Sequence, residues 1–152
     1  MKIIISIFTL ILFSNQCGQN NESKVEDAQV GQNQEELTIT YEAQTRGFYE
    51  KVWADQTGIF FADNRELNNV KTAQISKAVW EELMALKNAI NLDALPNLKA
   101  PSEKRFSDGA PIGSLIIKTK QAEVESSEFD HGNPPQEIKA LVNKLLSIKE
   151  KL

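Results

Sequence analysis

LTITYEAQTRGFYEKVWA, residues 37–54, is the stretch that decides the fold of this 152-residue chain. Every second residue from Leu37 to Ala43 is apolar, and residues 48–54 alternate in a similar way. A period of two places successive side chains on opposite faces of a strand, so both segments are predicted to be half-buried β-strands. The connection contains Arg46-Gly47, which suits a turn. It is too short for a crossover, so the two strands must be antiparallel.

The next residues extend this pattern into a sheet and a helix. GIFFADN (58–64) predicts a third strand, which a hairpin loop at residues 55–58 joins to the second. Ser76 is the expected N-cap of a helix that ends near Asn91. The apolar residues of this helix fall on one face, at Val79, Leu83, Leu86 and Ile90.

The second half of the chain completes the fold. Residues 96–111 are rich in loop signals, and a loop of this length is often functional or mobile. GSLIIKTK (113–120) predicts a central strand, and AEVESSEF (122–129) predicts an outer one. In the last helix Asn133 is the expected N-cap and Pro134 the first residue. Its expected buried stripe is Ile138, Leu141, Val142, Leu145 and Ile148.

These segments predict an α+β protein. We expect a single antiparallel sheet of about five strands with two helices packed on one face, in the order β-β-β-α-β-β-α. From Gly113 onward, over about 40 residues that include GSLIIKTK and FDHGNPPQEIKALVNKLL, the chain resembles uncharacterised small envelope domains of bacteria. This resemblance implies an architecture and no activity.

The N-terminal 17 residues, MKIIISIFTLILFSNQC, differ from the rest. One lysine precedes an apolar run from Ile3 to Phe13, which is shorter than the ~20 residues that span a bilayer. This arrangement is typical of a secretory signal. Cys17 is the only cysteine, so it cannot form an intramolecular disulfide.

The position of Cys17 directly after the apolar run resembles the signal peptides of bacterial lipoproteins, although Phe13 and Gln16 depart from that family's usual pattern. The resemblance implies that residues 1–16 are a signal peptide and that Cys17 carries acyl chains such as palmitate. Gly18 in place of an aspartate favours the outer membrane, with its face left open. The alternative is a secretory signal with an incidental cysteine.

Residues 17–36 are expected to form a lipidated, disordered and acidic tether, and residues 37–152 a single domain. Between residues 18 and 36 there are five acidic side chains and one lysine, whereas residues 37–152 contain 16 acidic and 15 basic side chains. A basic footprint for phosphate backbones is therefore missing, which argues against nucleic-acid binding.

Asp130-His131 is the first candidate site, because a carboxylate beside an imidazole can serve acid–base chemistry. The alternative is a strand-to-helix turn in which Gly132 supplies backbone freedom. His131 is the only histidine, and metal sites usually need three or four ligands, so no metal is expected. The sequence also lacks a Gly-rich phosphate loop and other cofactor motifs, so no cofactor is expected.

Two further candidates are binding surfaces. Arg105 and Phe106 lie in the long loop, where cations beside an aromatic ring can grip a carboxylate or a partner surface. The alternative is a solvated loop in which Phe106 packs on the core. Tyr49, Trp53 and Phe61 form an exposed aromatic patch if they face away from the helices, and part of the core if they do not.

We therefore expect a lipid-anchored, non-enzymatic module of the cell envelope that binds a protein or peptide. Its expected partners are the membrane, through the lipid, and a protein or peptide, through the open sheet face or the 96–112 loop. One alternative is a small periplasmic hydrolase using Asp130 and His131. Another is a structural envelope protein without a defined ligand.

Overall fold

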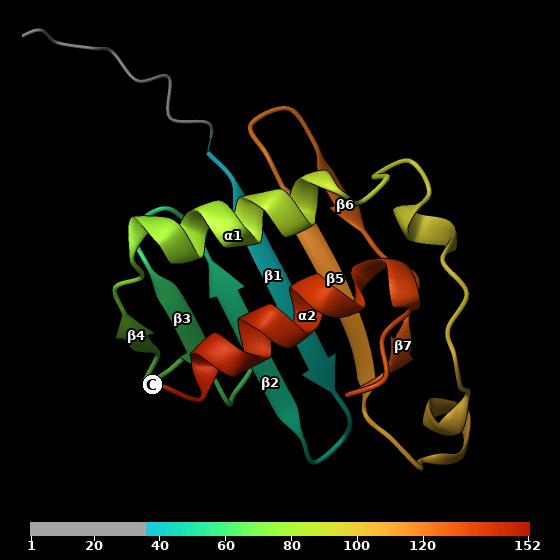
Figure 1. The fold of residues 1–152 in the computed structure, drawn as a ribbon. Helices are drawn as coiled ribbons and strands as arrows, with labels where there is room; N and C mark the ends of the chain where they lie inside the picture. The colour runs from blue at the N-terminus through green and yellow to red at the C-terminus, as the bar shows by residue number, and fades with distance from the viewer. Residues whose placement is uncertain (1–35) are drawn as a thin grey trace, which may run out of the picture. The chain divides into compact units, whose positions relative to one another are not determined.

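The computed structural model describes residues 36–152, so the predicted signal peptide, Cys17 and all of the tether before residue 36 lie outside the described residues. The described chain is an α+β fold (Figure 1). Its elements in chain order are β1 (Thr38–Gln44), β2 (Tyr49–Ala54), β3 (Ile59–Ala62), β4 (Lys71–Ala73), α1 (Lys77–Asn88), the 3₁₀ turns η1 (Leu95–Asn97) and η2 (Lys104–Ser107), β5 (Ile112–Lys118), β6 (Glu123–Glu125), β7 (Phe129–Asp130) and α2 (Gln136–Lys149).

The sheet is seven-stranded and antiparallel, and six of its strands lie in the order β4-β3-β2-β1-β5-β6. The seventh strand, β7, pairs with the first residues of β5, whereas β6 pairs with the last residues of β5. β1 lies at the centre, where Tyr41 is opposite Val52 of β2 on one side and Leu115 of β5 on the other. All three side chains are fully buried. The apolar alternation of residues 37–54 therefore fixes the register of β1 with β2 on one side. The same apolar face of β1 meets the apolar residues of β5 on the other side.

Both helices lie on the same face of the sheet (Figure 1). α1 and α2 contact each other, and Lys144 of α2 forms an ion pair with Glu82 of α1. The core lies between the helices and this face of the sheet, and its largest fully buried aliphatic side chains are Ile39, Val52, Ile59, Leu83, Leu95, Leu115, Ile117, Ile138, Leu141 and Leu145. None of the helices in residues 36–152 has the length and apolar content that crossing a membrane requires.

Two strands beyond the expected five account for the difference from the predicted order. β4 was missed because it has only three residues, Lys71 to Ala73, which are too few to show a period. The expected strand at residues 122–129 is divided into β6 and β7. Between them, the Ser127 backbone N–H donates to the Leu95 carbonyl, so the chain leaves the sheet edge to bond with η1.

The prediction that Asn133 caps the last helix was wrong. α2 begins at Gln136, and Pro135 before it makes no side-chain cap. A residue before proline is disfavoured in helical conformation, so Pro134 cannot be the first helical residue when Pro135 follows it. The Asn133 amide donates instead to Ser102 Oγ at 2.7 Å, which ties this turn to the long loop.

We predict that Gly58→Ala destabilises the fold by about 1–3 kcal/mol, because a Cβ at Gly58 would lie 2.6 Å from the Ala73 carbonyl oxygen of β4. The matched control is Gly47→Ala, since a Cβ at Gly47 would meet nothing within 4 Å, and it should change stability by less than about 0.5 kcal/mol. Urea unfolding of both variants measures the difference. Equal midpoints would contradict the close packing of β4 on residue 58.

Candidate functional site

The face of the sheet opposite the helices carries a row of large side chains. Strand pairing places Phe60, Trp53, Thr40 and Ile116 next to one another across β3, β2, β1 and β5. The rings of Trp53 and Phe60 are stacked, with centroids 5.3 Å apart and an angle of 10° between their planes. Phe60, Trp53 and Ile116 are only half-buried, because neither helix of residues 36–152 covers this face.

A groove of about 470 Å³ lies over Trp53, Thr40 and Ile116 of this row. Its lining residues come from β1, β2, β5, β6 and the β3–β4 loop, and they are Thr38, Thr40, Lys51, Trp53, Leu67, Ile116, Lys118 and Glu123. Leu67 is the lining residue that the β3–β4 loop supplies, and it is 40% exposed. We call this feature the sheet groove.

Leu67 is held in an unusual conformation by its own loop. Its φ of 52° lies in the left-handed region, which costs a non-glycine residue of order 1–3 kcal/mol. Asn64 braces the loop, since its Nδ2 donates to the Asn68 carbonyl at 2.7 Å and its Oδ1 accepts from the Asn68 N–H at 2.9 Å. The Leu67 N–H also donates to the Asn64 carbonyl. These hydrogen bonds hold the Leu67 side chain at the wall of the sheet groove.

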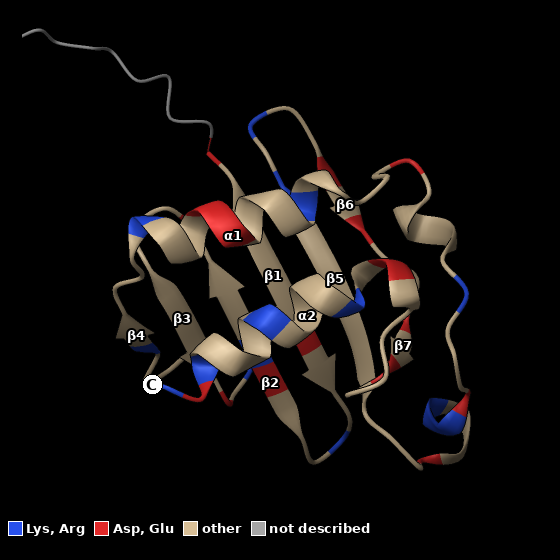
Figure 2. Ribbon diagram, viewed as in Figure 1, with Lys and Arg blue, Asp and Glu red and all other residues tan. Residues whose placement is uncertain are grey.

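Charges of both signs surround the sheet groove. Lys51 pairs with Glu42 at 3.7 Å, and Lys118 pairs with Glu123 at 3.0 Å. The Lys51 ammonium also lies 5.9 Å from the Trp53 ring centroid. Because each lysine is offset by a carboxylate, the groove has no strong preference for an anion. Figure 2 shows a similar mixture of basic and acidic positions along the helices and strands seen from the other side.

Tyr49 stands on the same face, at the end of β2. Burial raises the pKa of its hydroxyl and the nearby Glu42 carboxylate raises it further, whereas Arg65 acts in the opposite direction. The guanidinium of Arg65 lies 5.5 Å from the Tyr49 ring centroid. The Tyr49 hydroxyl therefore stays protonated at neutral pH.

Asp130 is the centre of a second polar cluster, at the junction of β7 and the long loop. Its carboxylate is 98% buried and accepts from Ser102 Oγ at 2.6 Å and from the backbone N–H groups of Lys104 and Arg105 at 2.8 and 3.0 Å. Burial alone would raise the pKa of this carboxyl, but the hydrogen bonds from Ser102, Arg105 and Lys104 outweigh it and hold the pKa well below the usual range.

His131 does not share the contacts of Asp130. Its Nδ1 lies 2.6 Å from the Tyr41 hydroxyl, and its ring packs against Phe48 with centroids 5.3 Å apart. Burial raises the pKa of Tyr41, the Gly132 backbone N–H opposes this, and Glu50 adds to it. Tyr41 therefore stays protonated, and its hydroxyl shares a hydrogen bond with Nδ1 of His131. None of the hydrogen bonds found within residues 36–152 joins the imidazole to the Asp130 carboxylate.

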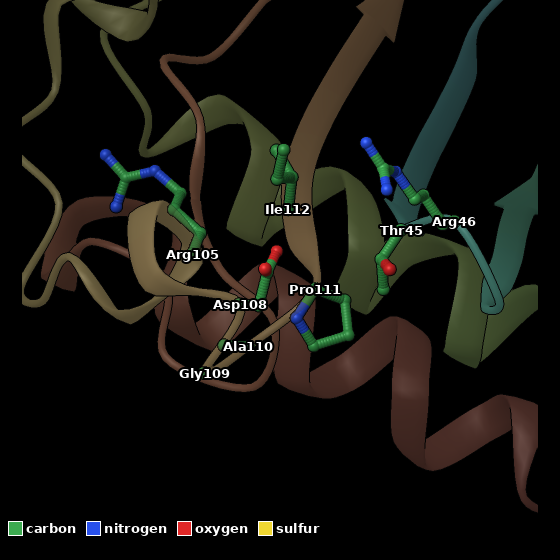
Figure 3. Close-up of a pocket in the computed structure, with 8 residues that line it drawn as sticks. All are labelled: Thr45, Arg46, Arg105, Asp108, Gly109, Ala110, Pro111 and Ile112. Atoms are coloured by element: carbon green, nitrogen blue, oxygen red, sulfur yellow. The ribbon is translucent and has the colours of Figure 1, made fainter.

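Arg105 and Phe106 lie together in η2, and Phe106 is 72% exposed. A small pocket of about 320 Å³ lies between this loop and the β1–β2 turn (Figure 3). Arg46 and Asp108 stand on different sides of it, and the Arg105 side chain is directed away from Ile112. Within residues 36–152, no group of three His, Cys, Asp or Glu side chains is arranged to hold a metal ion.

The structure therefore separates the predicted site residues into three places. Tyr49 and Trp53 lie on the uncovered face, but Phe61 does not, because it packs against the core on the helix side and contacts Lys149. Sequence reasoning missed the contributions of Phe60, Ile116 and Leu67. The apolar pair Ile116-Ile117 was the available signal for Ile116, since two adjacent apolar residues in a strand must face opposite ways.

No known family model matches this chain, and no curated protein is significantly similar to it. The site is therefore interpreted from its geometry alone.

We predict that the stability difference between the wild type and Asp130→Asn depends on pH. The pKa of Asp130 is lower in the folded chain than its usual 3.8, so folding favours the ionised form. The contribution of the ionised Asp130 carboxylate to the free energy of unfolding is fully present above the usual pKa. It is lost as the pH falls through the lower pKa that Asp130 has in the folded chain. The difference in unfolding free energy should be constant above about pH 5 and should narrow below about pH 4.

Urea unfolding at a series of pH values measures this difference. The matched control is Asp93→Asn, because Asp93 is exposed and its carboxylate forms no ion pair within residues 36–152. If the difference in unfolding free energy between the wild type and Asp130→Asn did not change with pH, the hydrogen bonds assigned to Asp130 would be contradicted.

Proposed function

We propose that this protein is a lipid-anchored, non-enzymatic module of the bacterial cell envelope that binds an extended peptide segment of another protein in the sheet groove. The single observation behind this proposal is the uncovered sheet face, on which the stacked Trp53–Phe60 pair lies beside a groove with an apolar wall at Leu67. Exposed apolar surface of this kind marks interaction sites in soluble domains.

The chemistry of the groove suits a peptide. Its volume falls in the range of roughly 300–1,000 Å³ that is common for ligand sites. The apolar row provides contact area for a side chain, and the Thr38 and Thr40 hydroxyls can exchange hydrogen bonds with a backbone. The paired lysines and carboxylates at its edge accommodate a segment that carries charges of both signs.

The hydrogen bonds of Asp130 and His131 also support a binding role. The hydrolase alternative requires Asp130 to orient His131, but the Asp130 carboxylate accepts its hydrogen bonds from Ser102, Lys104 and Arg105. His131 meets the Tyr41 hydroxyl instead. These contacts favour the binding role over a hydrolase that uses Asp130 and His131.

The proposed location follows from the N-terminal sequence. Cys17 would hold the protein at the outer membrane through its acyl chains, and the acidic residues 18–36 would separate the domain from the bilayer. The domain would then be held within reach of proteins at the membrane surface.

We predict that a photoreactive benzoylphenylalanine at position 116, on the floor of the groove, cross-links to a discrete partner protein in intact cells. The matched control is the same residue at Lys139, which is exposed on α2 on the opposite face. Trp53→Ala should remove the product at position 116 and weaken the affinity of the purified partner by about tenfold or more. Equal labelling from both positions, or an unchanged affinity, would contradict the proposal.

We predict that Cys17→Ser releases the protein from the membrane fraction and abolishes incorporation of labelled palmitate. A single acyl chain gives only marginal membrane binding, so the multiply acylated cysteine is the whole anchor. Membrane fractionation with a Ser14→Ala control measures the effect. A Cys17→Ser protein that remains in the membrane fraction would contradict lipid attachment at this residue.

A further inference from the structure

Phe106 is the most exposed large apolar side chain in residues 36–152, at 72%. It lies in η2, within the loop that connects η1 to β5. None of the residues that line the sheet groove belongs to this loop. Phe106 is therefore a feature that the proposed function does not use.

The loop around Phe106 is held by the sheet. Asp130 in β7 accepts hydrogen bonds from the backbone N–H groups of Lys104 and Arg105, which precede Phe106 directly. Ser102 Oγ donates to the same carboxylate and accepts from the Asn133 amide. The Phe106 N–H donates to the Glu103 carbonyl. The backbone that leads into Phe106 is thus fixed, although the ring itself faces solvent.

The ring is also fixed by its neighbour. The Arg105 guanidinium lies 4.2 Å from the Phe106 ring centroid, so one face of the ring is stacked. Nη1 of Arg105 donates to the Ser102 carbonyl at 2.7 Å and to Asp130 Oδ1 at 3.2 Å, and the Arg105 side chain is only 9% exposed. A buried, anchored arginine thereby supports an exposed aromatic side chain.

We propose that Phe106, stacked on Arg105, is a preorganised anchor that inserts into an apolar pocket of a protein partner, and that Asp130 is the positioning residue for this anchor. An aromatic side chain beside an arginine is the composition found at the energetic centres of protein interfaces. Rigid presentation lowers the entropy cost of binding, because the loop and the ring are ordered before the partner arrives.

A protein pocket fits the surroundings of Phe106 better than a membrane does. The exposed neighbours Glu103 and Asp108 are acidic and would be repelled by an anionic lipid surface. Lys104 supplies one exposed cation, so this turn has no basic excess. A single ring without a second exposed apolar residue in η2 suits a pocket of matching shape. We therefore expect binding that depends weakly on salt.

The experiment uses the full-length protein in cells, with photoreactive benzoylphenylalanine at position 106. The matched control carries it at Ser107, which is exposed in the same turn. We expect a discrete protein adduct from position 106, weaker labelling from position 107 and several-fold less adduct from position 106 in an Asp130→Asn background. Labelling of lipid alone, no adduct, or an adduct unaffected by Asp130→Asn would overturn the proposal.

The cross-linked partner is then purified, and its affinity is measured directly. Phe106→Ala should weaken binding by about tenfold or more without changing the urea midpoint, because the side chain is exposed. Raising the salt concentration should leave the wild-type affinity within about twofold. Equal affinities for the wild type and Phe106→Ala would overturn the anchor role.

Amide hydrogen exchange tests the positioning role separately. In Asp130→Asn the amides of Lys104 and Arg105 should exchange faster, while those of β1 keep their protection. If this variant does not fold, Ser102→Ala, which removes one hydrogen bond to the carboxylate, provides the same comparison. Unchanged exchange at both amides would show that Asp130 does not position the anchor.

Discussion

The packing of both helices on one face of the sheet is the constraint on which the other features depend (Figure 1). Side chains of a strand alternate between faces, so covering one face decides the environment of every residue in the sheet at once. Val52 and Tyr41 are fully buried for this reason, and Trp53 and Ile116 remain accessible for the same reason. The sheet groove is thus a direct consequence of the placement of both helices of residues 36–152 on the same side of the sheet.

Three buried polar groups, Glu50, Tyr41 and Asp130, each bond with a side chain from another segment of the described chain. Glu50 faces the helix side, where its Oε2 accepts from Lys149 of α2 at 2.8 Å. Removing one partner of such a pair leaves an uncompensated buried charge. Tyr41 and His131 form a second pair, and Asp130 with Arg105 forms a third. The first pair joins the helix to the sheet, whereas the third joins the long loop to it, so each fixes an otherwise separate segment.

The two proposed recognition elements differ in how they are built. The sheet groove is a wide surface with an apolar row, an apolar wall at Leu67 and charges of both signs at its edge. The Phe106 anchor is a single ring held by Arg105 and by hydrogen bonds to Asp130. Leu67 and Phe106 share one property, since each is an exposed apolar residue whose loop is braced by an Asn or Asp side chain. At Leu67 the left-handed backbone adds a conformational cost.

The sequence by itself determined the α+β class, the antiparallel pairing of the first strands and the buried stripe of α2. These follow from local periodicity, because alternation and helical spacing are properties of short segments. It also placed Tyr49 and Trp53 on the same face, without showing which face the helices cover. Only the tertiary structure decided that Phe60, rather than Phe61, joins Trp53, and that Asp130 meets Arg105 instead of His131. Such contacts join residues of different strands and loops, and spacing within one segment carries no information about them.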